Sequence, residues 1–255
     1  MCTLALYYRI SSEFPLIVAA NRDERYDRPS SPPATLGTYP AVVAGVDLRA
    51  GGTWLGANSH GLVAGILNRR EQQAAADDGD ARSRGLLCLE LLRLRSAGEA
   101  RAALPGHERF HYRPFVLVWA DRDQAWTACN DRDTIRAVEL TEGLHLFSNR
   151  ADEAAGRGKV ERARALFEEL LPRLREGARS IPEIVGGLHR ALREHDGPAE
   201  DAAPADAVCA HGEASGTVSS SIVLFAARAG ELRTFYCPGP PCRNGFTEAP
   251  ALRVE

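Results

Sequence analysis

Residues 2–24, CTLALYYRISSEFPLIVAANRDE, contain two apolar runs separated by a short polar segment. Residues 3–10 are apolar at nearly every position, which is typical of a strand buried on both faces. Residues 15–20 form a second such run, with Pro15 at its first position, where a missing backbone donor is tolerated. The pattern predicts a β-hairpin that returns the polar residues 21–24 to the neighbourhood of Cys2.

Cys2 has the chemistry of an N-terminal nucleophile. Methionine aminopeptidases act when the second side chain is small, and removal of Met1 would give Cys2 a free α-amine beside its thiol. The thiol titrates near about 8.5 and the amine near about 8, so one residue would carry both nucleophile and base. We expect Arg22 to favour the thiolate and Asp23 to hold the amine by a hydrogen bond. The alternative interpretation is an inert N-terminus followed by a solvated loop.

Motifs spread along most of the chain resemble the NRDE-domain family, which includes the transport and Golgi organisation protein 2. They are Asn21-Arg22-Asp23-Glu24, residues 26–29, Ala44-Gly45 with Asp47, residues 51–56, Asn68-Arg69, residues 143–149 with Lys159, and residues 211–220. The resemblance implies an α+β fold of the N-terminal-nucleophile (Ntn) hydrolase type, a four-layer αββα sandwich of two antiparallel sheets flanked by helices. It also implies a single NRDE domain over residues 1–255, in which residues 238–255 form an extended C-terminal tail.

The choloylglycine hydrolase and penicillin acylase group, which shares this fold, extends the set of candidate site residues. Asn68 falls at the end of a hairpin where that group has an asparagine of the oxyanion hole, a role that suits an amide donor. Asn149 falls where the group has a second active-site asparagine. The alternative is that both side chains cap turns. The predicted catalytic set is Cys2, Asn21, Arg22, Asp23, Asn68 and Asn149.

The sequence departs from the related patterns at two positions. The family stretch that matches residues 216–221 usually carries an arginine, where this chain has Val218. In choloylglycine hydrolases an arginine begins the run after the second strand, where this chain has Ala20. Arg22 could substitute only from a neighbouring position, and we expect its guanidinium on the other face of the strand. Both departures weaken a direct transfer of amidase activity.

Composition excludes several classes of function. The formal net charge is −3, and arginine is interspersed with acidic residues, so the chain lacks the basic stripe that nucleic acid requires. No apolar run is long enough to span a bilayer and no export signal is recognisable, so we expect no membrane insertion and a cytoplasmic protein. The 6 cysteines are therefore expected as free thiols. The Cys237 and Cys242 pair lacks a second ligand pair, and no metal site is predicted.

Periodicity and turn residues predict the remaining elements. Capping by Ser180 with Glu183 indicates the start of one helix. We predict helices at residues 83–95, 99–104, 159–175 and 180–194, strands at residues 53–55, 62–67, 114–120, 125–129 and 135–140, a final hairpin at residues 219–227 and 232–237, and polar loops at residues 72–82 and 195–213.

Two functions from different classes remain open. The first is an amidohydrolase that acts on a small or acylated C–N bond through Cys2. The second, implied by the resemblance, is a non-catalytic protein that handles haem, acyl-CoA or lipid in the same pocket. No cofactor is required, but haem is possible as a ligand, with Cys2 or His211 as an axial ligand. The expected partner is a small molecule, and the sequence leaves its identity and the oligomeric state open.

Overall fold

The computed structural model describes residues 2–69, 81–131, 134–149, 161, 163–177, 180–195 and 207–255. The chain divides into two compact units, and each is described by itself. The first unit comprises Met1–Arg28 and Glu142–Ala251, and the second comprises Pro29–Thr141 and Leu252–Glu255.

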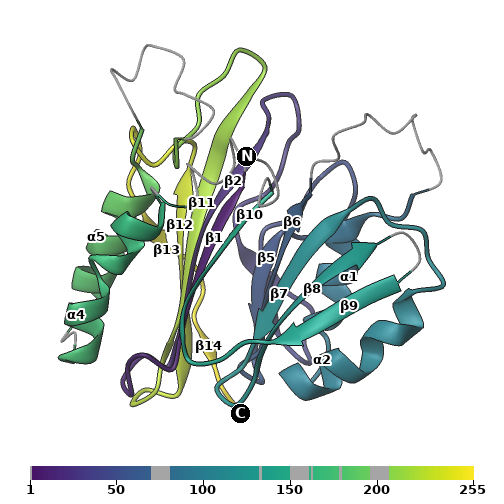
Figure 1. Ribbon diagram of the computed structural model, residues 1–255, viewed down its shortest axis with the longest axis horizontal. Coiled ribbons are helices and arrows are strands. Elements are labelled where there is room, and N and C mark those ends of the chain that lie inside the picture. Colours follow the sequence, from purple (N-terminus) through teal and green to yellow (C-terminus); the bar gives the residue numbers. More distant parts are fainter. Residues whose placement is uncertain are drawn as a thin grey trace. The chain divides into compact units, whose positions relative to one another are not determined.

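An antiparallel sheet forms the centre of the first unit (Figure 1). Its strand order is β10-β1-β2-β11-β12-β13. The strands are β1 (Thr3–Tyr8), β2 (Leu16–Arg25), β10 (Gly143–Ser148), β11 (Ser215–Ala226), β12 (Glu231–Pro238) and β13 (Thr247–Glu248). The predicted hairpin is confirmed, because β1 pairs with β2 in a register that sets Thr3 opposite Asn21. β10 pairs with the other edge of β1. All residues of β1 are buried, in agreement with its apolar residues on both faces.

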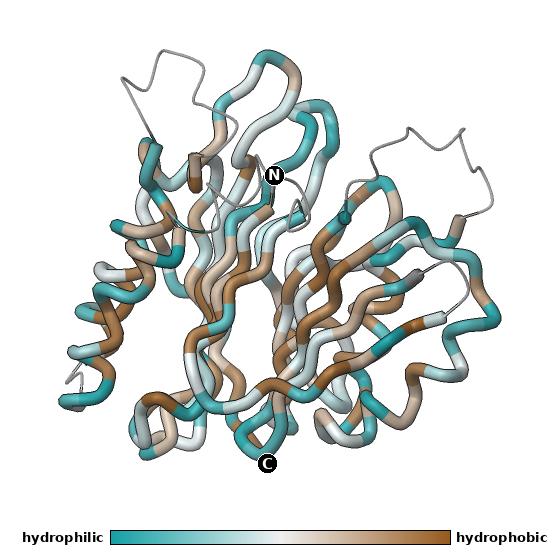
Figure 2. The backbone as a smooth tube through the Cα atoms, in the orientation of Figure 1, coloured by the Kyte–Doolittle hydropathy of each residue, from teal (hydrophilic) through white to brown (hydrophobic). Residues whose placement is uncertain are grey.

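Helices cover one face of this sheet. They are α4 (Leu171–Arg175) and α5 (Ile181–Leu192), together with helical residues at 163–168. Ser180 caps α5, because its side chain accepts a hydrogen bond from the backbone N–H of Glu183, as the sequence predicts. Figure 2 shows apolar residues along the strands and on one side of α5. The core between them includes Ala5, Tyr7, Ile17, Ala19, Phe167, Leu188, Ile222 and Leu224.

The second unit has its own antiparallel sheet, with the strand order β3-β4-β5-β6-β7-β8-β9. The strands are β3 (Ala34–Leu36), β4 (Val42–Ala44), β5 (Leu55–Asn58), β6 (Val63–Asn68), β7 (Phe115–Ala120), β8 (Ala125–Asp131) and β9 (Thr134–Glu139). Its helices are α1 (Arg84–Leu91), α2 (Ala97–Ala103) and the 3-10 turn η1 (Leu104–His107), and they share a core with one face of the sheet. The short strand β14 (Leu252–Arg253) also belongs to this unit.

The predicted fold class is confirmed: the chain is α+β, with two antiparallel sheets and helices on a face of each. Four local predictions are wrong. The strand predicted at residues 53–55 begins only at Leu55 and runs to Asn58. Residues 21–25 continue β2, because β11 pairs with them, and do not follow the strand as a loop. The first helix ends at Leu91, four residues early. Residues 207–209 are fully buried rather than part of an exposed loop. Most of the predicted polar loop at residues 72–82 lies outside the described residues.

Within the described part of the chain, no helix combines the length and the apolar character needed to cross a membrane.

Candidate functional site

The candidate site begins at the end of β1, where three predicted residues come together. Thr3 pairs with Ser148 of β10 on one side and with Asn21 of β2 on the other. Continuing both registers by one residue brings Asn149 and Arg22 to either side of Cys2. Strand pairing thus brings Asn149 close to Cys2, although the two residues are more than a hundred positions apart in the sequence.

Asn21 faces the helical side of the sheet, and its amide is fully engaged there. Its Nδ2 donates to the backbone carbonyls of Leu192 and Val208, both at 2.9 Å. Its Oδ1 accepts a hydrogen bond from the hydroxyl of Ser220 at 2.5 Å. These hydrogen bonds connect β2 to the end of α5 and to the segment before β11, so Asn21 has a structural role on the helical face of the sheet.

Arg22 and Ala20 lie on the same face of β2, opposite to the face of Asn21. They are two residues apart, and side chains on a strand repeat every two residues. The expectation that the guanidinium would point to the other face is therefore wrong. Arg22 is buried, with 6% of its surface exposed. It lies one step along the same face from the place where the related hydrolases carry arginine.

Asp23 contacts the Cys2 thiol through its backbone. The Sγ of Cys2 donates to the backbone carbonyl of Asp23 at 3.5 Å. The carboxylate of Asp23 accepts a hydrogen bond from the hydroxyl of Thr217 at 2.6 Å. Burial first, and then the charge of Asp23, raise the pKa of the Cys2 thiol above its ordinary value. Arg22 is not among the groups that shift this pKa, so the expectation that it favours the thiolate stays a prediction.

A β-bulge in β11 forms the other border of the site. Thr217 pairs with Asp23, and Ser219 pairs with Arg22, so Val218 is the extra residue. The carbonyl of Val218 accepts a hydrogen bond from the backbone N–H of Gly239. Val218, at the position where the family usually carries arginine, is therefore the bulge residue that changes the direction of β11.

Ser219 and Tyr236 complete the surroundings of Arg22, and sequence reasoning assigned no role to either. Burial raises the pKa of the Tyr236 phenol, while the charge of Arg22 partly offsets this. Ser219 belongs to the run TVSSS that carries part of the family resemblance. Tyr236 had no such signal, because only the pairing of β11 with β12 brings it to this position.

Asn149 is buried, with 5% of its surface exposed. Its Oδ1 has no hydrogen-bond partner among the described residues. A buried acceptor left in this condition costs free energy, so the position is unfavourable for stability alone. Asn68 ends β6 in the second unit and is exposed, opposite Phe115. Asn68 belongs to the second unit and Cys2 to the first, and the oxyanion role of Asn68 stays a prediction.

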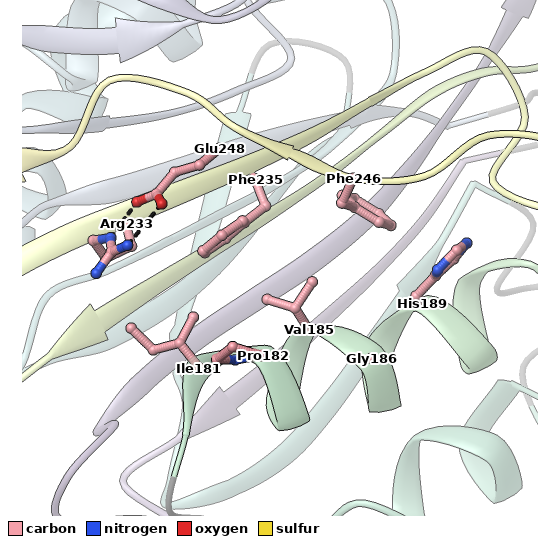
Figure 3. A pocket seen from close by; sticks show the side chains of 9 residues that line it. All are labelled: Ile181, Pro182, Val185, Gly186, His189, Arg233, Phe235, Phe246 and Glu248. Atoms are coloured by element: carbon pink, nitrogen blue, oxygen red, sulfur yellow. Dashed lines mark hydrogen bonds and ion pairs between the residues drawn. The ribbon is translucent and has the colours of Figure 1, made fainter.

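A separate cavity of about 620 Å³ lies between α5 and the strands β12 and β13 of the first unit (Figure 3). Phe235 and Phe246 supply aromatic surface, and Arg233 pairs with Glu248 at its edge. The Nε2 of His189 lies 2.7 Å from the carbonyl of Pro241. The remaining lining residues are Ile181, Pro182, Val185 and Gly186. This cavity belongs to the helical face of the sheet, whereas Arg22 lies on the opposite face.

The fold is that of the Ntn hydrolases. The chain superposes on penicillin V acylase from Agrobacterium tumefaciens with a TM-score of 0.56 and 12% identity, over 93% of this chain and 83% of that one. Superposition on a mutant of the conjugated bile acid hydrolase from Clostridium perfringens has a TM-score of 0.57 and 10% identity, over 100% of this chain and 98% of that one. Superposition on the Caenorhabditis elegans ortholog of N-acylethanolamine-hydrolyzing acid amidase has a TM-score of 0.56 and 13% identity, over 88% of this chain and 92% of that one.

The chain belongs to the transport and Golgi organisation 2 family, whose model matches residues 1–231. It is 28% identical over 234 residues to the human transport and Golgi organization protein 2 homolog, which covers 83% of this chain and 82% of the human protein. The mouse homolog is 27% identical over the same length, with the same coverage. The predicted family resemblance is confirmed.

Proposed function

We propose that this protein is an amidohydrolase that uses Cys2 as an N-terminal nucleophile to cleave a small or acylated C–N bond. The observation that carries the proposal is the pairing of Thr3 with Ser148 and with Asn21, which places Asn149, Cys2 and Arg22 next to these paired residues. A nucleophile, a cation and a buried, unengaged amide carbonyl are thereby gathered on the first unit of the chain.

The first step of the proposed reaction transfers the proton of the Cys2 thiol, whose pKa is raised in the chain that carries Met1. A protonated thiol needs a base at the moment of attack, and the α-amine exposed by loss of Met1 serves as that base. The amine takes the thiol proton while sulfur attacks the carbonyl carbon. The amine then gives this proton to the leaving nitrogen as the C–N bond breaks, which leaves a thioester on Cys2. Water attacks the thioester, and sulfur leaves with a proton as the carboxylic acid is released.

The neighbouring residues have separate roles in this proposal. The Oδ1 of Asn149 accepts a hydrogen bond from the N–H of the amide substrate and so orients the scissile bond. Arg22 attracts an anionic group of the substrate or the developing oxyanion. Asp23 orients the α-amine, while Asn21 holds β2 in place. Asn68 keeps its predicted role as an oxyanion donor.

The known activities of the solved neighbours support the class of reaction. Two of the three are named as an acylase and an amidase, and the third as a hydrolase of conjugated bile acids. The substrate of this chain is left to experiment.

A panel of N-acyl amides tests the proposal directly. The untagged protein is incubated with short- and long-chain N-acyl amino acids, and acid release is measured by mass spectrometry. Cys2→Ala abolishes turnover, and the control Cys129→Ser, a half-buried thiol on β8, keeps it. Equal activity of Cys2→Ala and the parent would overturn the assignment, provided circular dichroism shows both to be folded.

The cavity of about 620 Å³ favours a second function, the binding of an apolar ligand such as an acyl chain or haem. In this reading Phe235 and Phe246 contact the ligand, so it does not share a pocket with Cys2. A fluorescent fatty acid is titrated against the parent and Phe246→Asp, and haem is titrated with detection of the Soret band. Loss of fatty-acid affinity in the variant supports this function. Unchanged affinity, together with an unshifted Soret band, contradicts it.

The cytoplasmic location expected from the sequence stays a prediction. Fractionation of cells that express the untagged chain tests it, with recovery in the cytosolic fraction as the expected result.

A further inference from the structure

Four side chains that coordinate transition metals converge at one end of the first unit. The Sγ atoms of Cys209 and Cys242 are 3.7 Å apart. The Nε2 of His211 lies 3.6 Å from the sulfur of Cys209 and 3.2 Å from that of Cys242. His195 joins them, because its ring nitrogen, that of His211 and the sulfur of Cys242 all lie within 4.8 Å of one another. The two imidazole rings are perpendicular, with centroids 5.5 Å apart.

The separations among Cys209, His211 and Cys242 match the edges of a tetrahedral coordination shell. With Zn–S near 2.3 Å and Zn–N near 2.0–2.1 Å, a tetrahedral site sets two sulfurs about 3.8 Å apart and a sulfur and a nitrogen about 3.5 Å apart. The values for Cys209, His211 and Cys242 lie within about 0.3 Å of these edges. A disulfide would instead require the two sulfurs to be about 2.05 Å apart.

The candidate ligands come from three segments, each fixed by backbone hydrogen bonds. The N–H of Cys209 donates to the carbonyl of Glu194, just after α5, at 2.8 Å. His211 forms an isolated bridge with Gly216 at the start of β11. Cys242 lies in the turn after β12, where the carbonyl of Pro240 accepts from two backbone N–H groups. The donor atoms are thus held in position by the fold itself.

Burial favours a closed site. Cys209 is fully buried, and the other three side chains are half-buried. Two thiolates and two imidazoles form the ligand set of structural zinc, which is four-coordinate and has no open position for substrate. Two thiolates also neutralise a divalent cation, so its burial leaves no net charge.

We propose that Cys209, His211, Cys242 and His195 bind one zinc ion, which cross-links the end of α5, the start of β11 and the turn after β12. Each thiol releases one proton as its sulfur binds the metal, and each imidazole binds through a neutral ring nitrogen. No oxidant or reductant takes part. The cysteine pair considered from the sequence, Cys237 and Cys242, is thereby replaced by a pair 33 residues apart.

The experiment uses the full-length chain, reduced and freed of metal, and titrates it with Co²⁺ as a spectroscopic substitute for zinc. The expected result is saturation at one Co²⁺ per chain, with a thiolate-to-cobalt charge-transfer band and the strong visible bands of tetrahedral cobalt, all reversed by one equivalent of Zn²⁺. Cys242→Ser and His211→Ala lose most of this signal. Cys237→Ser is the matched control, because its sulfur donates to the carbonyls of Gly239 and Asn244 and lies outside the cluster.

Two results would overturn the proposal. One is the absence of a charge-transfer band in the reduced parent protein, and the other is an equal loss of the band in Cys237→Ser. His195→Ala tests the fourth ligand: it weakens Co²⁺ binding but keeps the charge-transfer band. The change in Tm on adding Zn²⁺ is compared within each variant, so a variant of lower stability can still be tested. Zn²⁺ raises the Tm of the parent and of Cys237→Ser, but an equal increase in Cys242→Ser would contradict the site.

Discussion

The Cys2 thiol donates a hydrogen bond to the backbone carbonyl of Asp23, at 3.5 Å, while the charge on the side chain of the same aspartate opposes ionisation of that thiol. The two residues are adjacent because β1 and β2 pair antiparallel. Burial and this negative charge both raise the pKa of the Cys2 thiol.

Replacement of Asp23 by asparagine is expected to make Cys2 easier to ionise. Asparagine keeps an acceptor for the Thr217 hydroxyl but removes the negative charge that raises the pKa of the thiol. The rate of Cys2 alkylation by iodoacetamide, mapped by peptide mass spectrometry across pH 6–10, reports thiolate directly. The pH profile of Asp23→Asn is shifted to lower pH.

Asp27→Asn provides the control, because Asp27 is an exposed partner of Arg25 and does not contribute to the pKa of Cys2. Superimposable profiles for Asp23→Asn and the parent would show that burial alone raises the pKa.

Asn21→Ala is expected to destabilise the fold by about 2–5 kcal/mol, because it leaves the carbonyls of Leu192 and Val208 and the hydroxyl of Ser220 without their partner. Urea denaturation measures the difference in free energy of unfolding. Asn68→Ala is the matched control: this side chain is exposed at a strand end, so its loss changes stability by less than about 0.5 kcal/mol. Similar costs for the two substitutions would contradict the supporting role of Asn21.

Asn149→Leu separates stability from function. Leucine has the same number of side-chain heavy atoms and the same branching but no buried acceptor, so we expect the free energy of unfolding to fall by less than about 1 kcal/mol, or to rise. Amide turnover is expected to be lost, because the substrate N–H has no acceptor. A large loss of stability would instead identify Asn149 as a structural residue.

Gly52→Ala is expected to cost about 2–3 kcal/mol, because the new Cβ would lie 2.1 Å from the carbonyl carbon of Gly85, and both partners are backbone. Gly106→Ala serves as the control, because a Cβ there meets open space. Thermal or urea unfolding compares the two variants. Equal stability would mean that the backbones of residues 52 and 85 separate at little cost.

The sequence predicts those parts of the fold that depend on local patterns. The apolar runs of β1 and β2 and the Ser180 cap of α5 are examples, because periodicity and capping act over a few residues. The end of β2 was missed, since residues 21–25 are polar and become strand only through pairing with β11.

The same limit applies to the candidate site. The proximity of Cys2 to Arg22 and Asp23 depends on one hairpin, so the sequence was sufficient to predict it. The prediction that Arg22 points to the other face of β2 from Ala20 is wrong, although residues two apart on a strand lie on the same face. Tyr236 and the cluster of Cys209, His211 and Cys242 depend on contacts between distant segments, which no short pattern reveals.

The most direct test of the central claim is the intact mass of the untagged protein, before and after brief treatment with a thiol-reactive acyl electrophile. The account predicts a chain without Met1 that gains one acyl group, mapped to Cys2 and absent from Cys2→Ala. Retained Met1, or an acyl group on another cysteine, would contradict the role of Cys2 as an N-terminal nucleophile.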